Sequence, residues 1–331
     1  MVQPQSIPEP VDPAQDEFDS PDAPWNAEPE VRETMVVSAL HAQRLDKAVV
    51  ALADEFSRNH LQGLIEQGHV RLNGVVTTSP SRKVAAGQLL RVELVPTAQS
   101  RAFRPEALPI EIVHEDEHLM VVNKAAGMVV HPAAGNWSGT LLNALLAHHA
   151  GAASLARAGI VHRLDKDTSG LMVVGKTLRA VTALSRAIAA REVSRQYLAI
   201  VHGEVQPAAF RVEAPIGRDP QSRIRMAVVG SGKPARTDVL ALARQGGFSA
   251  LQCTLHTGRT HQIRVHLSAR GHPLVADAVY GGKPVLDMTR QALHATRLGF
   301  IHPVNGQELV FLADPPADFA QAWRVVVTTA D

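Results

Sequence analysis

Apolar side chains recur with helical spacing soon after residue 40. The positions that share one helix face are Leu45, Val49, Leu52 and Phe56. This i, i+4, i+7, i+11 pattern predicts an amphipathic helix, and Ser57 is suited to cap a second helix behind it. Asn73-Gly74 between short β-forming runs is the strongest local signal for a hairpin, and residues 89–95 have the composition of a further strand. We therefore predict a small α+β unit over residues 43–95.

The rest of the chain mixes strand-like and helical stretches. Residues 118–122 and 171–174 are apolar runs typical of buried strands, whereas residues 179–191 have an apolar helix face. The strands have irregular spacing and few βα repeats, which favours an α+β fold over a doubly wound sheet. We predict one large domain over residues 109–327. A linker that contains Pro, Ser and Arg, residues 96–108, joins it to the small unit.

Residues 1–36 lack apolar periodicity. They contain seven prolines, and nine carboxylates stand against a single base, Arg32. Such a segment buries too little apolar surface to offset the entropy of ordering it, so we predict a disordered acidic tail that adds nothing to a core. The whole chain has a net charge of +1 and the tail accounts for −8, so the body carries +9. A basic body suits a polyanionic partner such as nucleic acid, although an ordinary soluble surface also fits this charge.

The composition excludes several classes of protein. An apolar fraction of 45% is ordinary for a globular protein, and no apolar run approaches the roughly 18–20 residues that cross a bilayer. The N-terminus has neither the basic start nor the apolar stretch of a secretory signal. Cys253 is the single cysteine, so the chain forms no internal disulfide and no cysteine-based metal cage. We expect a cytoplasmic protein without membrane contact.

The densest run of polar and glycine residues is segment 159–170. It has the sequence Gly-Ile-Val-His-Arg-Leu-Asp-Lys-Asp-Thr-Ser-Gly. A loop between core strands commonly displays reactive groups, and the cations Arg163 and Lys166 flank Asp165 in sequence. Nearby cations keep a carboxylate ionised and available as nucleophile or base. From the residues alone, however, a turn whose aspartates cap backbone groups is the favoured interpretation.

The small unit resembles the S4 RNA-binding module. Its matching segments occur in the expected order, and they are Arg44-Leu45-Asp46-Lys47, Ser57-Arg58, Leu64-Ile65, Gly68-His69-Val70 and Val70-Arg71-Leu72-Asn73-Gly74. In such a module, basic side chains off the apolar positions are expected to face RNA. These are Arg44, Lys47, Arg58, Arg71, Arg82 and Lys83. The alternative is a charged face that contacts only solvent.

The run from Gly159 to Thr177 closely resembles the signature loop of the RluA family of pseudouridine synthases. Further family-like segments follow in order at 195–201, 257–267, 272–275, 280–282 and 291–295. Together with the S4-like unit, they look most like the RluD branch, which modifies large-subunit ribosomal RNA. The resemblance spans about residues 43–327. It implies a pseudouridine synthase fold, which is a mixed, largely antiparallel central sheet with flanking helices.

The resemblance implies three catalytic residues. Asp165 falls on the family's catalytic aspartate, and Tyr197 on the tyrosine that stacks on the base and relays a proton at C5. Arg264 falls on the basic residue that pairs with the aspartate. Without the resemblance, Tyr197 is interpreted as a half-buried strand tyrosine, and Arg264 as a residue on the polar face of a strand at 257–267.

Three more residues are expected to serve binding. Leu267 matches the apolar residue that packs under the base. Arg163 is expected to fill, by stacking, the space that an extruded uridine leaves, with a phosphate contact as the alternative. His162 is expected to order the loop rather than to exchange protons.

The resulting prediction is an RNA-modifying isomerase that uses no metal and no cofactor. His256, His261 and His266 recur every five residues, and a strand would place them on alternating faces, where they cannot bind one metal ion. The reaction breaks the C1′–N1 bond of a uridine, turns the base over and rejoins it through C5. Whether Asp165 attacks C1′ or removes the C2′ proton stays open. The expected partner of this monomeric protein is large-subunit (23S) ribosomal RNA, free or in the subunit particle, and its expected target is the loop of helix 69.

Three alternatives stay open. The same chemistry at another site of 23S ribosomal RNA, or on transfer RNA, fits the same motifs. A non-catalytic RNA-binding factor of ribosome assembly is disfavoured by the intact Asp165, Tyr197 and Arg264. A nucleoside hydrolase or glycosidase would need two cooperating carboxylates or a metal site, and the S4-like unit argues against it.

Overall fold

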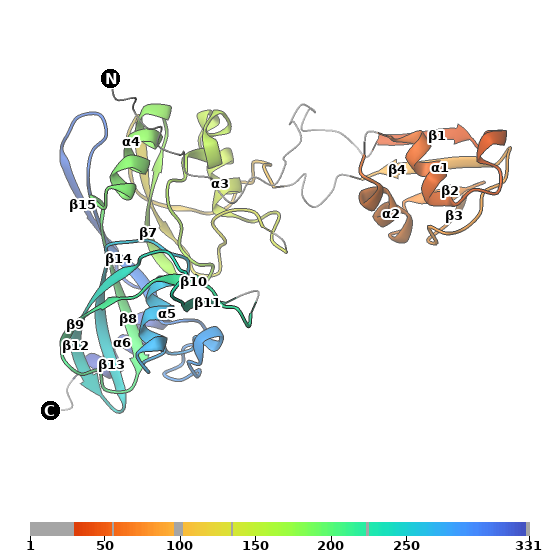
Figure 1. Cartoon of the computed structure of the whole chain (residues 1–331). Coiled ribbons are helices and arrows are strands. Elements are labelled where there is room, and N and C mark those ends of the chain that lie inside the picture. Colours follow the sequence, from red (N-terminus) through yellow and green to blue (C-terminus); the bar gives the residue numbers. More distant parts are fainter. Residues whose placement is uncertain (1–29, 55, 96–101, 134, 223–224, 329–331) are drawn as a thin grey trace, which may run out of the picture. The chain divides into compact units, whose positions relative to one another are not determined.

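The computed structural model describes residues 30–54, 56–95, 102–133, 135–222 and 225–328 (Figure 1). Contacts divide the chain into two compact units, Met1–Pro96 and Thr97–Asp331, which we call the N-terminal and the C-terminal unit. Most of the predicted acidic tail, residues 1–29, and the linker residues 96–101 lie outside the described residues.

The N-terminal unit is a four-stranded antiparallel sheet with two helices packed on it. Its elements are β1 (Glu30–Met35), η1 (Ser38–Leu40), α1 (Leu45–Leu52), α2 (Arg58–Glu66), β2 (Val70–Leu72), β3 (Val75–Val76) and β4 (Leu89–Leu94). The strand order is β1-β4-β2-β3. The predicted helices and hairpin are confirmed. Ser57 accepts a hydrogen bond from the His60 backbone at 3.3 Å, and Asn73 and Gly74 have φ angles of 49° and 80° in the turn.

Strand β1 departs from the sequence prediction. We expected residues 1–36 to be disordered, but Glu30–Met35 pairs along its whole length with Leu89–Leu94 of β4. Val36, next in the chain, is 3% exposed and belongs to the core of the unit. The prediction was wrong for this stretch because an edge strand with a largely exposed face has little apolar signal. Its order comes from the backbone groups of a partner strand more than fifty residues away.

The C-terminal unit contains most of the chain. Its strands are β5 (Glu111–Glu115), β6 (Leu119–Lys124), β7 (Ser169–Gly175), β8 (Ser194–His202), β9 (Ala209–Glu213), β10 (Ile216–Arg218), β11 (Met226–Val228), β12 (Arg236–Gln245), β13 (Phe248–Leu255), β14 (Leu293–Ile301) and β15 (Glu308–Leu312). Its helices are α3 (Leu141–His148), η3 (Ala150–Ser154), η4 (Ala156–Gly159), α4 (Leu178–Ala189), α5 (Gln262–Ala269), η5 (Ala278–Tyr280) and α6 (Ala317–Val327). Within the described residues, none of the helices has the length and apolar character needed to cross a bilayer.

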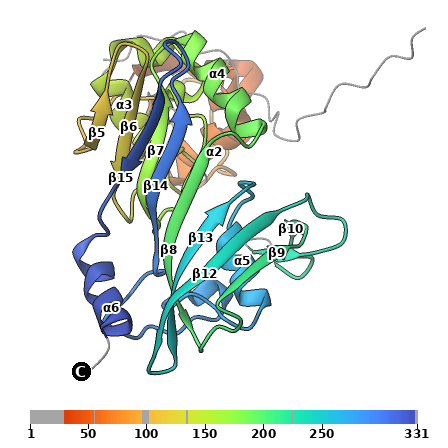
Figure 2. The same cartoon turned by 90° about the vertical axis from the view of Figure 1, so that its left-hand side faces the viewer.

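The large sheet of this unit has nine strands. Their order is β5-β6-β7-β14-β8-β13-β12-β9, and β15 pairs with β14. Neighbouring strands are antiparallel except β7 and β14, which are parallel. Figure 2 shows β8 near the middle, with β5, β6 and β7 to one side and β13 and β12 to the other. The predicted fold class, α+β with a mixed, largely antiparallel sheet, is confirmed.

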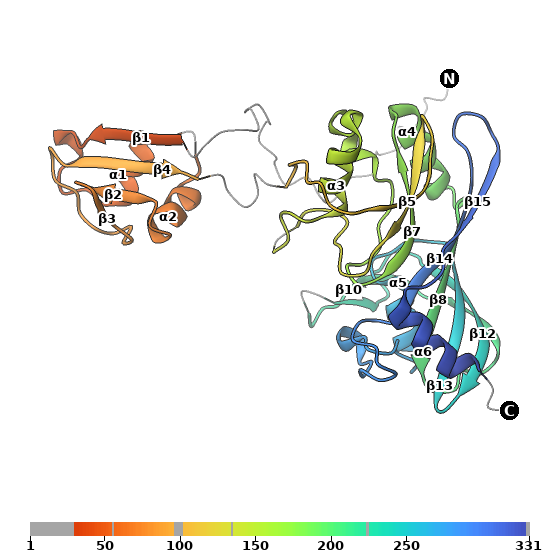
Figure 3. The same ribbon diagram turned by 180° about the vertical axis from the view of Figure 1, so that it is seen from behind.

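Alternate residues of β8 pack in two different cores. Tyr197, Ala199 and Val201 pack with side chains of α3 and α5, whereas Leu198 and Ile200 pack with α6. Accordingly, α5 lies toward the viewer in Figure 1 and α6 in Figure 3. Strand β7 alternates in the same way between the α3 core and a core formed with α4. We call the side of the sheet that carries α3 and α5 the front face.

The segment expected as a strand at 257–267 is instead largely helical. Helix α5 follows His261, whose φ of 57° is left-handed. Gln262–Leu267 is buried at every position, so the helix shows no apolar stripe of helical period in the sequence. The β-branched residues Ile263 and Val265 therefore gave the pattern of a strand. The argument that its histidines alternate between strand faces was therefore wrong. In the described part of the chain, no group of three or more His, Cys, Asp or Glu side chains is arranged to hold a metal ion.

Truncation tests the contribution of β1. Removing residues 1–36 takes away the partner of β4 and the buried Val36. Relative to a chain that begins at Glu30, we expect the N-terminal unit to lose about 2–3 kcal/mol of unfolding free energy, because a strand edge and part of the core become exposed. Hydrogen exchange of the amides of β2 and β4 measures this loss. Equal protection in the two truncated proteins would contradict a stabilising role for the strand.

Candidate active site

The Asp165 loop, residues 159–170, is bracketed by two glycines. Gly159 and Gly170 have φ angles of 84° and 116°, which L side chains rarely adopt. A Cβ atom would also collide with the backbone of β7 at Gly159 and with that of β14 at Gly170. Both ends of the loop are therefore held directly against the sheet.

Hydrogen bonds fix three consecutive carbonyl groups inside this loop. The backbone oxygens of residues 165, 166 and 167 each accept at least one bond. Their donors are the backbone of Thr168, the backbone of Gly127 together with the Lys124 ammonium, and the Arg290 guanidinium, at 2.9–3.1 Å. Lys124 is 2% exposed, and burial lowers the pKa of its ammonium to about 8. These contacts set the backbone position of Asp165.

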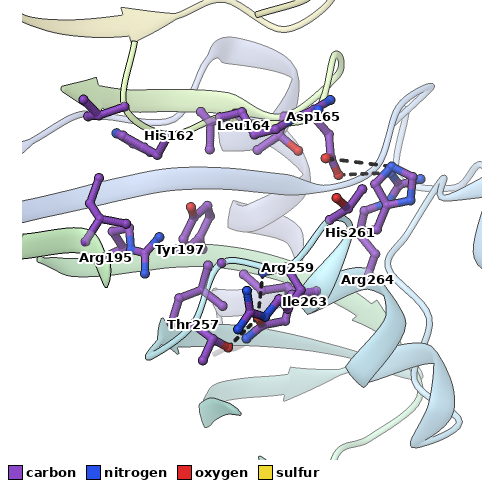
Figure 4. Close-up of a pocket in the computed structure, with 18 of the residues that line it drawn as sticks. His162, Leu164, Asp165, Arg195, Tyr197, Thr257, Arg259, His261, Ile263 and Arg264 are labelled. Atoms are coloured by element: carbon purple, nitrogen blue, oxygen red, sulfur yellow. Dashed lines mark hydrogen bonds and ion pairs between the residues drawn. The ribbon is translucent and has the colours of Figure 1, made fainter. Parts of the chain in front are cut away.

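Asp165 contacts Arg264 of α5, and Arg264 contacts a second carboxylate. The Arg264 Nη1 donates to Asp165 Oδ2 at 3.0 Å (Figure 4). Its Nε and Nη2 donate to the two oxygens of Asp277 at 2.7 and 2.8 Å. The Asp277 side chain is 1% exposed and that of Asp165 is 17% exposed. Burial disfavours the charged form of Arg264, but the hydrogen bonds and charges of both carboxylates outweigh it and raise the pKa of the guanidinium. The pair Arg264–Asp277 thus aims a permanent cation at Asp165.

A second basic side chain lies beside Asp165. The Nε2 atom of His261 is 3.9 Å from Asp165 Oδ1, and its Nδ1 is 2.8 Å from the Tyr280 hydroxyl. That hydroxyl also accepts a hydrogen bond from the Met226 backbone at 3.0 Å. Burial lowers the pKa of His261, which favours the neutral imidazole. When Nδ1 accepts from Tyr280, the imidazole carries its proton on Nε2, the nitrogen that faces Asp165.

A cleft of about 720 Å³ contains Asp165 and Tyr197. Its walls are the Asp165 loop, the end of α4, residues of β8, and the segment 256–264. Tyr197 is 6% exposed on the front face, and burial raises the pKa of its phenol. The apolar part of the lining is Ile160, Leu164, Leu255, Ile263 and Leu293. The cleft therefore joins an ionised carboxylate, a protonated phenol and an apolar floor, which suits a flat polar heterocycle.

Of the other three expected site residues, Arg163 and His162 line the cleft and Leu267 does not. Arg163 is exposed and lines the cleft. His162 accepts a hydrogen bond from the Val173 backbone at 3.0 Å, as expected for a residue that orders the loop. Leu267 is fully buried in the front-face core, and Ile263, one turn earlier in α5, is the α5 aliphatic side chain that lines the cleft. The family resemblance had assigned the place under the base to Leu267.

The six basic residues of the N-terminal unit that were expected to face RNA are all exposed. Arg44 and Arg58 converge on Asp46, whose side chain is fully buried, at 3.0 and 3.2 Å. Their hydrogen bonds hold the pKa of the Asp46 carboxyl well below its usual range. Arg82 and Lys83 lie close to the start of α1 as well, because their backbones bond to those of Leu45 and Arg44. Lys47 lies in the first turn of α1, and Arg71 lies apart in β2.

Several residues of the site were missed from the sequence. Asp277, which holds Arg264, lies between two family-like segments and has no local signal. His261 was considered only as a metal ligand, and Tyr280 only as part of a motif. Arg195, which lines the cleft, fell inside the segment 195–201 but received no role. The cations next to Asp165 in sequence are exposed, and the one that contacts it comes from 99 residues away.

Comparisons with known proteins find matches in both units. Residues 118–269 match the family model of RNA pseudouridylate synthase, and residues 43–90 match that of the S4 domain. The chain is 46% identical over 302 residues to ribosomal large subunit pseudouridine synthase D of Nitrosomonas europaea, covering 89% of this chain and 87% of that protein. It is 48% identical over 287 residues to the protein of the same name from Neisseria meningitidis serogroup B, covering 83% and 76%.

A solved structure is also similar. Human RNA pseudouridylate synthase domain containing 1 aligns with a TM-score of 0.53 and 28% sequence identity. The alignment covers 64% of this chain and 85% of that one. Much of the fold of this chain is thus shared with an experimentally determined protein.

Replacing Asp277 tests the buried ion pair. Asp277→Asn leaves Arg264 buried with half of its charge compensation, so we expect a loss of about 3 kcal/mol of unfolding free energy. Asp238 is a matched control, because Arg236 donates two hydrogen bonds to it at a site that is 35% exposed. Asp238→Asn should cost about 1 kcal/mol or less. Urea denaturation measures both, and equal losses would contradict the stabilising role of the buried pair.

Acid should destabilise the C-terminal unit through His162. Burial and the charge of Arg195 lower its pKa to about 3. Below about pH 6.5, His162 takes up a proton in the unfolded chain but not in the folded protein. The contribution of His162 to the unfolding free energy is therefore complete above about pH 6.5 and is lost as the pH falls toward 3. In His162→Gln, the unfolding free energy should fall less steeply between pH 6.5 and 4, by up to about 1.4 kcal/mol per pH unit. Parallel pH profiles of the two proteins would refute this assignment.

Proposed function

Because the chain belongs to the RNA pseudouridylate synthase family, we propose that it isomerises specific uridines of large-subunit ribosomal RNA to pseudouridine. The observation that carries this proposal is the Asp165–Arg264–Asp277 arrangement in a cleft floored by Tyr197 and Ile263. The names of the similar bacterial proteins support the choice of ribosomal RNA.

Asp165 supplies the carboxylate that the reaction needs at the sugar. Breaking the C1′–N1 bond leaves an electron-poor C1′, and the carboxylate either attacks C1′ or removes the C2′ proton. Both routes require an ionised and oriented carboxylate. Arg264 meets both needs by donating to Oδ2, and no hydrogen bond reaches Oδ1 from the described residues. Oδ1 is then the oxygen that acts on the sugar.

Tyr197 is the platform for the detached base. Its ring projects from the front face of β8 into the cleft, and stacking on it holds the uracil while the base turns from N1 to C5. The hydroxyl, whose pKa is raised, stays protonated and serves in the proton transfer from C5. Ile263 packs against the base from α5, in the role that the sequence had given to Leu267.

Arg163 compensates for the loss of the uridine from its stack. Extrusion of a base costs a few kcal/mol, and an exposed guanidinium on the Asp165 loop fills the vacated space by stacking on the neighbouring bases. Exposed basic side chains of the N-terminal unit bind the RNA backbone at a second place. They are Arg44, Lys47, Arg58, Arg71, Arg82 and Lys83.

The loop of helix 69 is the proposed target within that RNA. The support is the resemblance of residues 272–282 and 291–295 to the RluD branch, together with the S4 domain, which adds a second grip on a large folded RNA. The protein acts as a monomer in the cytoplasm, on free RNA or on the subunit particle.

Mapping pseudouridines with and without the gene tests the function. In cells that lack it, we expect pseudouridine to disappear from the helix 69 loop, and a plasmid with the wild-type gene should restore it. The Asp165→Asn gene should not, because the nearly isosteric amide is neither a nucleophile nor a base at neutral pH. Purified Asp165→Asn should still bind the RNA within a few-fold of wild type.

Each other outcome has a definite meaning. Loss at another site of large-subunit RNA would overturn the helix 69 target, and loss in transfer RNA alone would overturn the ribosomal substrate. Restoration by Asp165→Asn would favour an RNA-binding assembly factor whose chemistry is dispensable.

A further inference from the structure

Arg195 of β8 is a buried cation without a partner. The residue is 5% exposed, and neither a hydrogen bond nor an ion pair connects its side chain to any other described residue. Its Nε atom is completely buried. A guanidinium cannot release its proton at any ordinary pH, and a buried charge normally has a counterion because its desolvation is costly. In the free protein, no described residue therefore supplies a counterion or a hydrogen-bond acceptor for this cation.

The position of Arg195 directs this cation into the cleft. Arg195 and Tyr197 are two residues apart in β8 and share its front face, and both line the cleft. A Cβ atom on Gly258 would lie 2.9 Å from Arg195 Nη1, so the glycine makes room for the guanidinium. In the view of Figure 4, Arg195 lies beside Tyr197, and Asp165 lies on the other side of that ring.

The charges of Arg195 and Asp165 both affect the pKa of the Tyr197 phenol. Arg195 lowers the pKa of the phenol and Asp165 raises it, within the larger rise caused by burial. A base stacked on Tyr197 would therefore be exposed to a carboxylate at its sugar and to a guanidinium at its ring.

Depth separates Arg195 from the other arginines of the cleft. Arg157, Arg163 and Arg191 are exposed, and Arg259 is only partly buried. Arg264 is buried but fully occupied by two carboxylates. The phosphates of an RNA chain stay in water at the mouth, where the exposed guanidinium groups lie, whereas the base of the extruded nucleotide enters the interior. The deep, unpaired cation thus faces the base.

On the basis of the proposed function, we propose that Arg195 binds the carbonyl oxygens of the target uracil and stabilises the negative charge of the detached base. When the C1′–N1 bond breaks, its electron pair goes to N1, and the charge spreads over the ring to O2 and O4. C1′ is meanwhile satisfied by a bond to the Asp165 carboxylate, or by a double bond to C2′ after Asp165 takes that proton. The charge is consumed when C5 bonds to C1′, and in the same step the bond from C1′ to Asp165 breaks or Asp165 returns its proton to C2′. The proton of C5 is then replaced by one on N1, so the reaction stays an isomerisation.

Removing such a donor should slow bond cleavage without weakening binding. A preorganised donor aimed at developing charge typically contributes 10²- to 10³-fold to the rate. The test variant is Arg195→Met, which keeps the length of the side chain and removes its charge. Arg244→Met in β12 is the matched control, because Arg244 also has a buried Nη2 without a partner and lies outside the cleft.

The experiment measures the single-turnover rate with saturating RNA, the Kd at several salt concentrations, and Tm. For Arg195→Met we expect a rate about 100-fold or more below wild type, a Kd within about three-fold, an unchanged salt slope, and a Tm that does not fall. Arg195→Lys should recover part of the rate, and Arg244→Met should react like wild type.

A substrate with a better leaving group distinguishes stabilisation of charge by Arg195 from a packing role of its side chain. In RNA whose target carries 5-fluorouridine, fluorine withdraws electrons from the detached ring, so the missing cation matters less. The ratio of wild-type to Arg195→Met cleavage rates should shrink at least ten-fold on this substrate, measured as consumption of 5-fluorouridine.

Three results would overturn the inference. A normal rate with weaker binding and a salt slope lower by about one would make Arg195 a phosphate contact. A lower Tm and the same rate ratio on both substrates would make its role structural. Wild-type protein that binds the RNA but does not react would refute the proposed function and this inference together, whereas an active wild type with an equally active Arg195→Met refutes the inference alone.

Discussion

The site depends on one buried ion pair, that between Arg264 and Asp277. Two hydrogen bonds of 2.7 and 2.8 Å fix the guanidinium plane, and its remaining Nη1 then has one direction, toward Asp165. A single hydrogen bond to Asp277 would leave the guanidinium plane free to turn about that bond. With two such bonds, the cation is oriented toward Asp165 before substrate arrives, and the orientation costs nothing during the reaction.

The sheet supplies the rigidity that this arrangement needs. The Asp165 loop is pressed against β7 and β14 at its two glycines, and its carbonyl groups accept hydrogen bonds from two other segments, residues 124–127 and Arg290. Helix α5 is buried along one face of the same sheet and carries both Arg264 and Ile263. Sites built on packed elements hold their geometry better than sites on free loops. Here the ends of the loop are buried against the sheet, while Arg163 and Lys166 within it stay exposed.

The two buried arginines of the cleft differ in their compensation. Arg264 is balanced by Asp165 and Asp277, so it orients a group that is already charged. Arg195 is unbalanced, and an unbalanced buried charge is a cost to stability that a protein retains where a transition state supplies the counterion. A cleft with a carboxylate at one side and a free cation at the other is matched to a reaction that separates a positive sugar from a negative base.

Local patterns in the sequence determined the small elements. The apolar spacing after residue 40, the Ser57 cap and the Asn73-Gly74 turn each act within a few residues, so the local chain specifies them. Asp165 was assigned a catalytic role only through the resemblance of residues 159–177 to a known family, since the residues alone favoured a capping turn. Tertiary structure alone decided what depends on distant partners: β1 is ordered by β4, α5 is a helix buried on all sides, and Asp277 holds Arg264. It also decided that Arg195 has no counterion, since charge balance belongs to a packed interior and has no period along a chain.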